Sequence, residues 1–221
     1  MNASGRAPAR AGPAVASALP ARLLIASNNP GKLREFGALL GPLGVALLAQ
    51  GDLAIAEAQE PFPTFLENAL AKARHAAAAS GLPALADDSG LCVDVLDGAP
   101  GVHSARYAGE PRSDERNNAR LLEQLEGFQD RTAAFVCTLV LVRHPLDPDP
   151  VVAQGRWVGR IARTPAGVGG FGYDPLFWVP EAACTSAELA PADKNARSHR
   201  GQALRRLLDL LCPTWAQQRG F

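Results

Sequence analysis

The pattern of apolar and polar positions predicts strands and helices in alternation from residue 22 onward. Apolar runs at 23–26 and 45–49 indicate two short strands. Between them, leucine and phenylalanine recur at helical spacing after Pro30 and predict a helix that ends at the Gly41-Pro42 pair. Further along, Thr64 and Glu67 have the spacing of a capping box and open an alanine-rich helix that Gly81 ends.

The second half of the chain continues the pattern with longer strands. Residues 84–96 predict two strands around an acidic turn, and a helix is expected over 114–126. Apolar residues at 132–143 and 151–163 predict two strands joined by a proline-rich hairpin, followed by a short strand at 176–179 and a last helix at 198–211. We therefore expect an α/β fold with a mixed central sheet flanked by helices, arranged as two lobes around an active-site cleft.

Composition narrows the class of protein. The 221 residues carry 22 basic and 22 acidic side chains, so bulk charge favours neither a nucleic acid nor a membrane surface as partner. The longest apolar stretch, 133–142, is too short to span a bilayer. The four cysteines form no C-x-x-C pair, which favours reduced thiols and a cytoplasmic protein.

Both ends of the chain are expected to lie outside the folded unit. Residues 1–21 are rich in alanine and proline, and the prolines interrupt any apolar core of a secretory signal, so a disordered tail is predicted there. An organelle-targeting peptide is the alternative. We expect one domain over residues 22–212 and a C-terminal tail over 213–221.

The turn that opens the first predicted helix has the composition of a phosphate-binding site. It combines backbone amides at a helix N-terminus, two asparagines, a glycine and a cation. These residues are Ser27, Asn28, Asn29, Pro30, Gly31 and Lys32. The spacing of a Walker loop is absent, so the nucleoside-triphosphatase mechanism of that loop is not supported. An ordinary capped helix with a solvated lysine is the alternative.

Three carboxylates are candidates for metal chemistry. Asp87 and Asp88 follow an apolar strand, and two adjacent buried anions need a compensating cation, for which Mg²⁺ is well suited. Glu60, in a proline-restricted loop, is a third carboxylate. The alternative is a hydrogen-bonded acidic turn without metal.

A glycine-rich loop at 167–174 and a cluster before the last helix predict the binding of a nucleobase. Aromatic rings beside an acid can stack on a purine, and a lysine, a histidine and an arginine supply donors to oxygens of a base or a phosphate. The candidates are Phe171, Gly172, Tyr173, Asp174, Lys194, His199 and Arg200. A glycine-rich hairpin and a solvated basic helix start are the alternatives.

Taken together and in order, these motifs closely resemble the inosine/xanthosine triphosphate pyrophosphatase family, from about Leu23 to Leu211. The resemblance rests on the segments SNNPGK at 27–32, TFLENA at 64–69, ADDSGL at 86–91, GAPG at 98–101, SARY at 104–107, GGFGYD at 169–174 and SHRG at 198–201.

The resemblance implies a homodimeric, Mg²⁺-dependent enzyme that cleaves ITP, dITP and XTP to the monophosphate and pyrophosphate, and so removes non-standard purine nucleotides from the nucleotide pool. By this resemblance Asp88 matches the proposed general base, Glu60 and Asp88 match metal ligands, and Ser89 matches a substrate contact. Asn29 and Lys32 match the phosphate-binding turn, and the candidates between Phe171 and Arg200 match the nucleobase side. The chain departs from many relatives at Phe62, where they have glycine.

Two other functions stay open at this point. One is a metal-dependent phosphohydrolase that releases orthophosphate from a different phosphorylated metabolite. The other is a nucleotide-binding protein without catalytic activity, which would bind tightly and turn nothing over.

Overall fold

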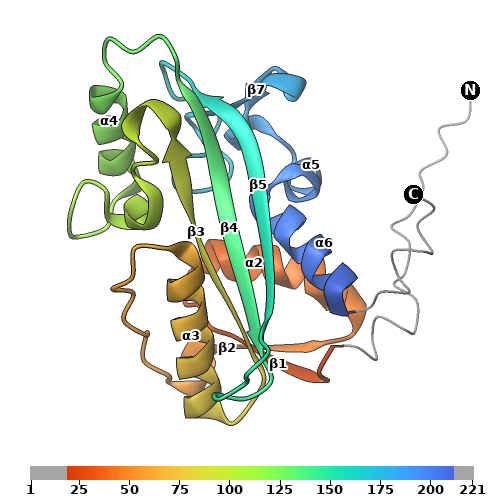
Figure 1. Cartoon of the computed structure of the whole chain (residues 1–221). Coiled ribbons are helices and arrows are strands. Elements are labelled where there is room, and N and C mark those ends of the chain that lie inside the picture. The colour runs from red at the N-terminus through yellow and green to blue at the C-terminus, as the bar shows by residue number, and fades with distance from the viewer. Residues whose placement is uncertain (1–18, 212–221) are drawn as a thin grey trace, which may run out of the picture.

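The computed structural model describes residues 19–211, which form an open seven-stranded sheet flanked by helices (Figure 1). The strand order is β2-β1-β3-β4-β5-β6-β7. The strands are β1 (Arg22–Ile25), β2 (Ala46–Ala49), β3 (Ala84–Val93), β4 (Thr132–Val142), β5 (Val151–Ile161), β6 (Phe177–Val179) and β7 (Cys184–Thr185). β1 pairs in parallel with β2 and β3, and every later pair is antiparallel, so the predicted mixed sheet is confirmed.

The helices cover both faces of the sheet. They are α2 (Pro30–Leu40), α3 (Phe65–Ser80), α4 (Asp114–Gln124), α5 (Pro191–Arg197) and α6 (His199–Leu211). The alanine face of α3 packs on β3 and β4, whereas α2 and α6 pack on the opposite face against leucines of β1, β3 and β4. At the other end, α4 and β6 pack with parts of β3, β4 and β5 in a separate apolar cluster that includes Leu91, Leu121, Trp157 and Phe177.

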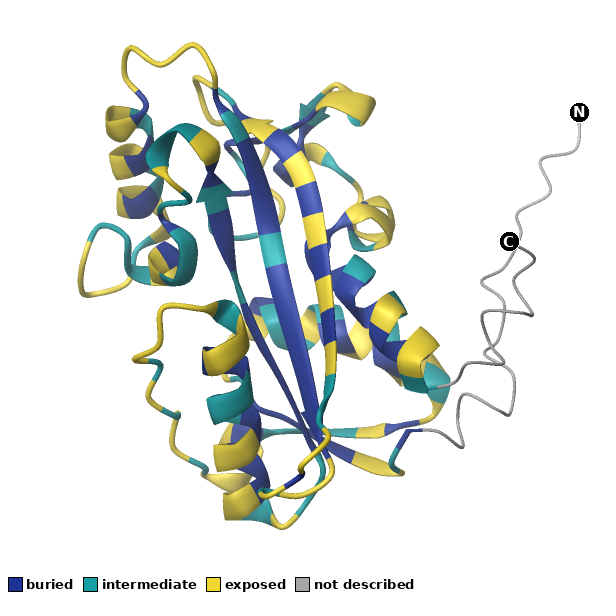
Figure 2. Cartoon of the chain, viewed as in Figure 1, coloured by how far each residue is buried: buried dark blue, intermediate teal, exposed yellow. Residues whose placement is uncertain are grey.

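The two apolar ends of the molecule are connected by the long strands. In Figure 1, β3, β4 and β5 run the full height of the molecule, from α3 at one end to α4 at the other. In Figure 2, β4 is buried almost throughout, while β5 alternates between buried and exposed residues. These strands therefore form the floor between the two lobes.

Most predicted elements are confirmed within a few residues. Asn29 caps α2 by accepting hydrogen bonds from the amides of Gly31 and Lys32, and Thr64 caps α3. The short helix α5 and strand β7 were not predicted, because each has too few residues to show a period. The predicted tails lie wholly or mainly outside residues 19–211. Within that range, no helix has both the length and the apolar character that a bilayer span requires.

One prediction about the sheet is wrong. Residues 84–93 form a single strand, not two strands around an acidic turn, because β3 pairs with β4 along its whole length. The pairing of β1 with β3 stops at Ile25 and Leu85. Asp87 and Asp88 therefore lie inside β3, immediately beyond the point where β1 ends, and not at a strand end.

Gly155 allows α6 to pack directly on β5. A Cβ atom at this position would lie 1.9 Å from the backbone oxygen of His199 and 2.6 Å from the backbone nitrogen of Ala203. Backbone atoms cannot rotate away, so Gly155→Ala is expected to reduce the free energy of unfolding by about 2–3 kcal/mol. Urea unfolding measures the change.

The matched control is Gly37→Ala on the exposed face of α2, where an added Cβ meets nothing within 4 Å. Because alanine favours a helix interior over glycine, this variant is expected to gain about 0.5–1 kcal/mol. Equal stability of Gly155→Ala and wild type would show that α6 tolerates displacement from the sheet.

Candidate active site

A cavity of about 410 Å³ opens between the two lobes. It is lined by the start of α2, the loop at 57–60, β3, the segment 102–106, the glycine-rich loop and the start of α6. The predicted site residues that line it are Ser27, Asn28, Asn29, Pro30, Lys32, Glu60, Asp88, Ser89, Phe171, Gly172, Tyr173, Asp174, Lys194, His199 and Arg200. Gly31 is buried and does not line the cavity. The structure thus brings together residues that are up to 173 positions apart in the sequence (Ser27 to Arg200).

The two adjacent aspartates point to opposite faces of the sheet, because side chains alternate along a strand. Asp87 points toward α2 and α6, where its Oδ2 atom contacts Lys32 Nζ at 3.0 Å and Arg200 Nη2 at 2.9 Å. Burial alone would raise the pKa of Asp87, but Lys32, Arg200 and Lys72 outweigh it and hold that pKa well below its usual range. Asp87 is therefore a buried anion that is compensated by the protein's own cations.

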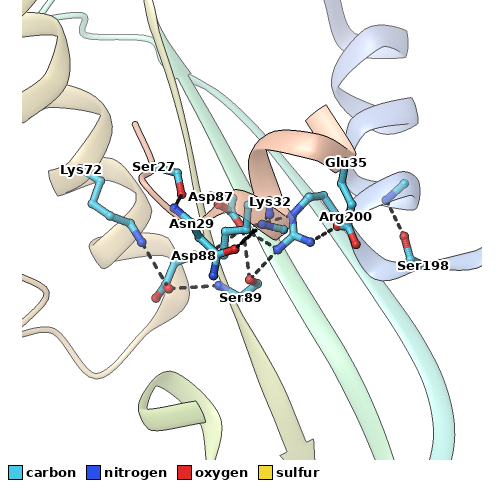
Figure 3. A network of polar contacts seen from close by, with 12 residues as sticks. Ser27, Asn29, Lys32, Glu35, Lys72, Asp87, Asp88, Ser89, Ser198 and Arg200 are labelled. Atoms are coloured by element: carbon cyan, nitrogen blue, oxygen red, sulfur yellow. Dashed lines mark hydrogen bonds and ion pairs between the residues drawn. The ribbon is translucent and has the colours of Figure 1, made fainter. Parts of the chain in front are cut away.

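Asp88 points toward α3 and into the cavity. Its carboxylate lies 3.4 Å from Lys72 Nζ and accepts a hydrogen bond from the amide of Ser89 (Figure 3). It also accepts a hydrogen bond from the side chain of Asn68. Burial raises the pKa of Asp88; the nearby Lys72 and Lys32 oppose this effect, and Glu60 and Asp87 add to it. A carboxylate with a raised pKa at a cavity wall is suited to accept a proton.

In the predicted phosphate turn, Lys32 lines the cavity, whereas the side chains of Asn28 and Asn29 form hydrogen bonds within the protein. Asn29 Oδ1 accepts from the amides of Gly31 and Lys32 at 2.8 and 3.1 Å, and Asn28 donates to Glu57. The side chain of Lys32 remains 16% exposed while it contacts Asp87. The ammonium group of Lys32 is therefore the charged donor that this turn presents.

The nucleobase-side candidates form a tightly bonded wall. Asp174 accepts from Lys194 Nζ at 2.6 Å and from the amide of Phe171 at 2.8 Å, and Ser186 donates to its second oxygen. Tyr173 is buried, and its hydroxyl donates to the backbone oxygen of Ser104. The polar atoms of Tyr173 and Asp174 are thus used within the protein, and their direct contact with a ligand stays a prediction.

His199 and Arg200, two of the nucleobase-side candidates, line the cavity from the start of α6. His199 stacks on Phe135 with ring centroids 4.8 Å apart, and its Nδ1 atom is buried without a hydrogen-bond partner among the described residues. Burial, Arg200 and Lys194 lower the pKa of His199 well below its usual value, so the ring is neutral. A neutral imidazole has one donor and one acceptor nitrogen, which suits recognition of a base edge.

Several charged residues that line the cavity are not among the predicted site residues, and Lys72 and Glu35 contact the predicted ones directly. Lys72 of α3 contacts both Asp88 and Glu60, at 3.4 and 3.3 Å. Glu35 of α2 contacts Lys194 at 3.5 Å and also accepts from Arg200. Helical spacing was the available signal: Lys72 lies four residues after Asn68, and Glu35 three residues after Lys32. Figure 3 shows Arg200 between Glu35 and Asp87.

The donor set at Asp88 fits a magnesium ion that is shared with a phosphorylated ligand. Among residues 19–211, no group of three or more His, Cys, Asp or Glu side chains is arranged to hold a metal by itself. Mg²⁺, however, is commonly held by one or two carboxylates, with water and substrate phosphates completing its shell. Asp88 and Glu60 supply two such carboxylates at the cavity, both next to Lys72 Nζ.

The fold and the site together define an α/β protein with an open mixed sheet and a charged cleft over the middle of its long strands. The chain belongs to the Ham1 family, whose family model matches residues 23–210. Two solved structures are similar to it: a HAM1 protein from Coxiella burnetii (TM-score 0.81, 47% identity, covering 86% of this chain and 98% of that one) and the Staphylococcus aureus Ham1 protein (TM-score 0.77, 40% identity, 86% and 97%).

Two sequence relatives are similar over nearly their whole length. The dITP/XTP pyrophosphatase of Ralstonia nicotianae is 59% identical over 193 residues, which cover 86% of this chain and 96% of the relative. The dITP/XTP pyrophosphatase of Aromatoleum aromaticum is 60% identical over 190 residues, with the same coverage.

Proposed function

We propose that this protein is a nucleoside-triphosphate pyrophosphatase that hydrolyses ITP, dITP and XTP to the monophosphate and pyrophosphate. The observation that carries the proposal is the single continuous cavity that joins Lys32, the Asp88–Glu60 pair and the aromatic wall with Phe171 and His199. These features match the triphosphate, the reaction centre and the purine of one substrate. The similarity to relatives that are named dITP/XTP pyrophosphatases supports the same substrates.

Asp88 is the proposed general base. It accepts a proton from a water molecule, whose oxygen attacks the α-phosphorus. The bond between the α-phosphorus and the oxygen that leads to the β-phosphorus breaks, and pyrophosphate leaves with the bonding electron pair. Lys72, which lies beside Asp88, stays cationic because Asp88, Asp87 and Glu60 raise its pKa against the effect of burial. It therefore offsets the charge that accumulates near the reaction centre.

Glu60 and Asp88 are the residues that we propose to hold Mg²⁺. When bound there, the ion polarises the phosphoryl group and neutralises its charge. Lys32 complements the ion by donating to the departing pyrophosphate. Asn68 orients Asp88, since its amide nitrogen donates to Asp88 Oδ2 at 3.2 Å.

We propose that Phe171 and His199, on one wall of the cavity, select the base. Phe171 supplies the stacking surface, and the neutral ring of His199, with an unpartnered buried Nδ1, supplies a donor or acceptor for the purine edge. A site built to bond a 6-oxo group leaves a buried polar group unpaired when adenine binds, which strongly disfavours ATP. We further propose that the protein forms a homodimer, as the family resemblance implies, and that it is cytoplasmic, as the spacing of its four cysteines favours.

The test is product analysis on ITP, dITP, XTP, ATP and GTP, with and without Mg²⁺, with pyrophosphate and orthophosphate measured separately. We expect Mg²⁺-dependent pyrophosphate release from the first three nucleotides and far slower release from ATP and GTP. Orthophosphate as the product would favour a different phosphohydrolase, and tight binding of all three without turnover would favour a binding protein.

Lys32→Ala is expected to weaken the binding of ITP more than that of IMP, because the lost ammonium group faces the terminal phosphates. A charge-assisted contact predicts a loss of about tenfold for a non-hydrolysable ITP analogue and less than about twofold for IMP. Calorimetric titration of both ligands measures the difference. Arg34→Ala, on the exposed side of α2, is the matched control. Equal weakening of both ligands by Lys32→Ala would argue against a phosphate role.

A further inference from the structure

The backbone of Gly172, beside the proposed stacking residue Phe171, is held from both sides by helix α4. Its amide donates to Asp114 Oδ2 at 2.6 Å, and its carbonyl oxygen accepts from Asn118 Nδ2 at 3.0 Å. Asp114 and Asn118 are four residues apart in the first turns of α4 and therefore lie on one helix face. Two side chains of one helix thus occupy both backbone polar groups of a single loop residue.

This arrangement has a consequence for recognition of the base. A free backbone amide beside Phe171 could donate a hydrogen bond to a purine oxygen. In the structure the amide of Phe171 is bonded to Asp174, and that of Gly172 to Asp114. Both amides are therefore occupied within the protein. Their role is to hold the loop.

The ring of Phe171 lies outside this network and faces the cavity. It packs over Gly31 of the phosphate turn, where an added Cβ would lie 2.7 Å from the ring, and Lys194 Nζ lies 5.1 Å from the ring centroid. The ring of Phe171 is therefore held between the anchored Gly172 and the phosphate turn, and it lines the cavity.

The loop has little stiffness of its own. Gly167, Gly170 and Gly172 have φ angles of +79°, +77° and +63°, a region that glycine enters freely. Glycine also loses the most backbone entropy when it is ordered. Restriction of this segment must come from contacts to other elements, and order that exists before binding increases affinity.

We propose that Asp114 and Asn118 are positioning residues for the nucleobase: by fixing Gly172, they hold the ring of Phe171 in place against the phosphate turn, where it lines the cavity and a purine can stack on it. Neither residue is among the predicted site residues. The inference rests on the proposed function, since it concerns how the same cavity selects its base. It assigns to α4, which lies in the lobe opposite the phosphate turn, a share in substrate selection.

The test compares Asp114→Ala, Asp114→Asn and Asn118→Ala with Glu115→Ala. Glu115 is the matched control: it is exposed, it lies in the same helical turn, and it makes no hydrogen bond or ion pair among residues 19–211. For Asp114→Ala we expect KM for ITP to rise about tenfold with kcat within about twofold. Affinity for IMP should fall to a similar extent, and affinity for pyrophosphate, which lacks a base, should not change.

Asp114→Asn should recover most of the IMP affinity, because the amide oxygen can still accept from Gly172, and Glu115→Ala should match wild type throughout. The proposal is overturned if Asp114→Ala retains wild-type KM and IMP affinity, or if it loses IMP and pyrophosphate affinity equally. Lack of ITP turnover by the wild-type protein would instead overturn the proposed function; the IMP and pyrophosphate titrations still test the positioning role.

Discussion

Asp88→Asn is expected to lower kcat for ITP hydrolysis by about a thousandfold, the middle of the range for loss of a general base. The asparagine has the same shape and cannot accept the proton of the attacking water. Its side-chain oxygen can still accept from Lys72 and from the amide of Ser89, so the fold should persist. Steady-state kinetics at saturating Mg²⁺ and a thermal melt of the same sample measure the two quantities.

Asp94→Asn is the control for this variant. Asp94 directly follows β3, its side chain is 52% exposed, and its ion pair with Arg156 spans 4.0 Å. The same chemical change there should leave both kcat and stability near wild type. Substantial Mg²⁺-dependent turnover by Asp88→Asn would refute the assignment of the base.

Asp87→Asn is expected to have the largest effect on stability, a loss of about 3–5 kcal/mol in the free energy of unfolding. The physical reason is that Asp87 compensates Arg200, whose side chain is 1% exposed, and Lys32. Removing this charge leaves Arg200 with Glu35 as its remaining acidic partner. Urea unfolding at pH 7 measures the loss.

A double variant tests whether charge is the cause. Asp87→Asn with Arg200→Gln removes both members of the pair, and we expect it to be more stable than Asp87→Asn alone, because a buried charge that has lost its main partner costs more than a removed pair. A double variant that loses the sum of both single effects would show that packing, not charge compensation, explains the destabilisation.

The charge of Asp87 should also make the stability of the protein depend on pH. Since the folded-state pKa of Asp87 is depressed, its contribution is fully present above the unfolded value, near 3.8, and is lost as the pH falls below that value. Wild type should therefore lose more stability than Asp87→Asn between about pH 5 and pH 2. Parallel loss in both proteins would contradict the assignment.

Much of this protein follows from local rules in its sequence. Asn29 and Thr64 cap helices because their side chains reach the free amides of the first turn, and the apolar positions place the long strands β4 and β5. Seven short motifs, taken in their order along the chain, likewise indicate the family. Helix caps and apolar patterns depend on residues that are close in the sequence, and the motifs are read directly from it, so the sequence alone determines these features.

The tertiary structure decided how the charged groups are paired. The sequence shows two adjacent aspartates, but only the pairing of β3 with β4 makes that segment one strand, which sends Asp87 and Asp88 to opposite faces and to different cations. Lys72 and Glu35 join the site through helix packing, and Asp114 reaches Gly172 across 58 residues of chain. Long-range packing has no signature in local spacing, so these contacts emerge only when the sheet and its helices are assembled.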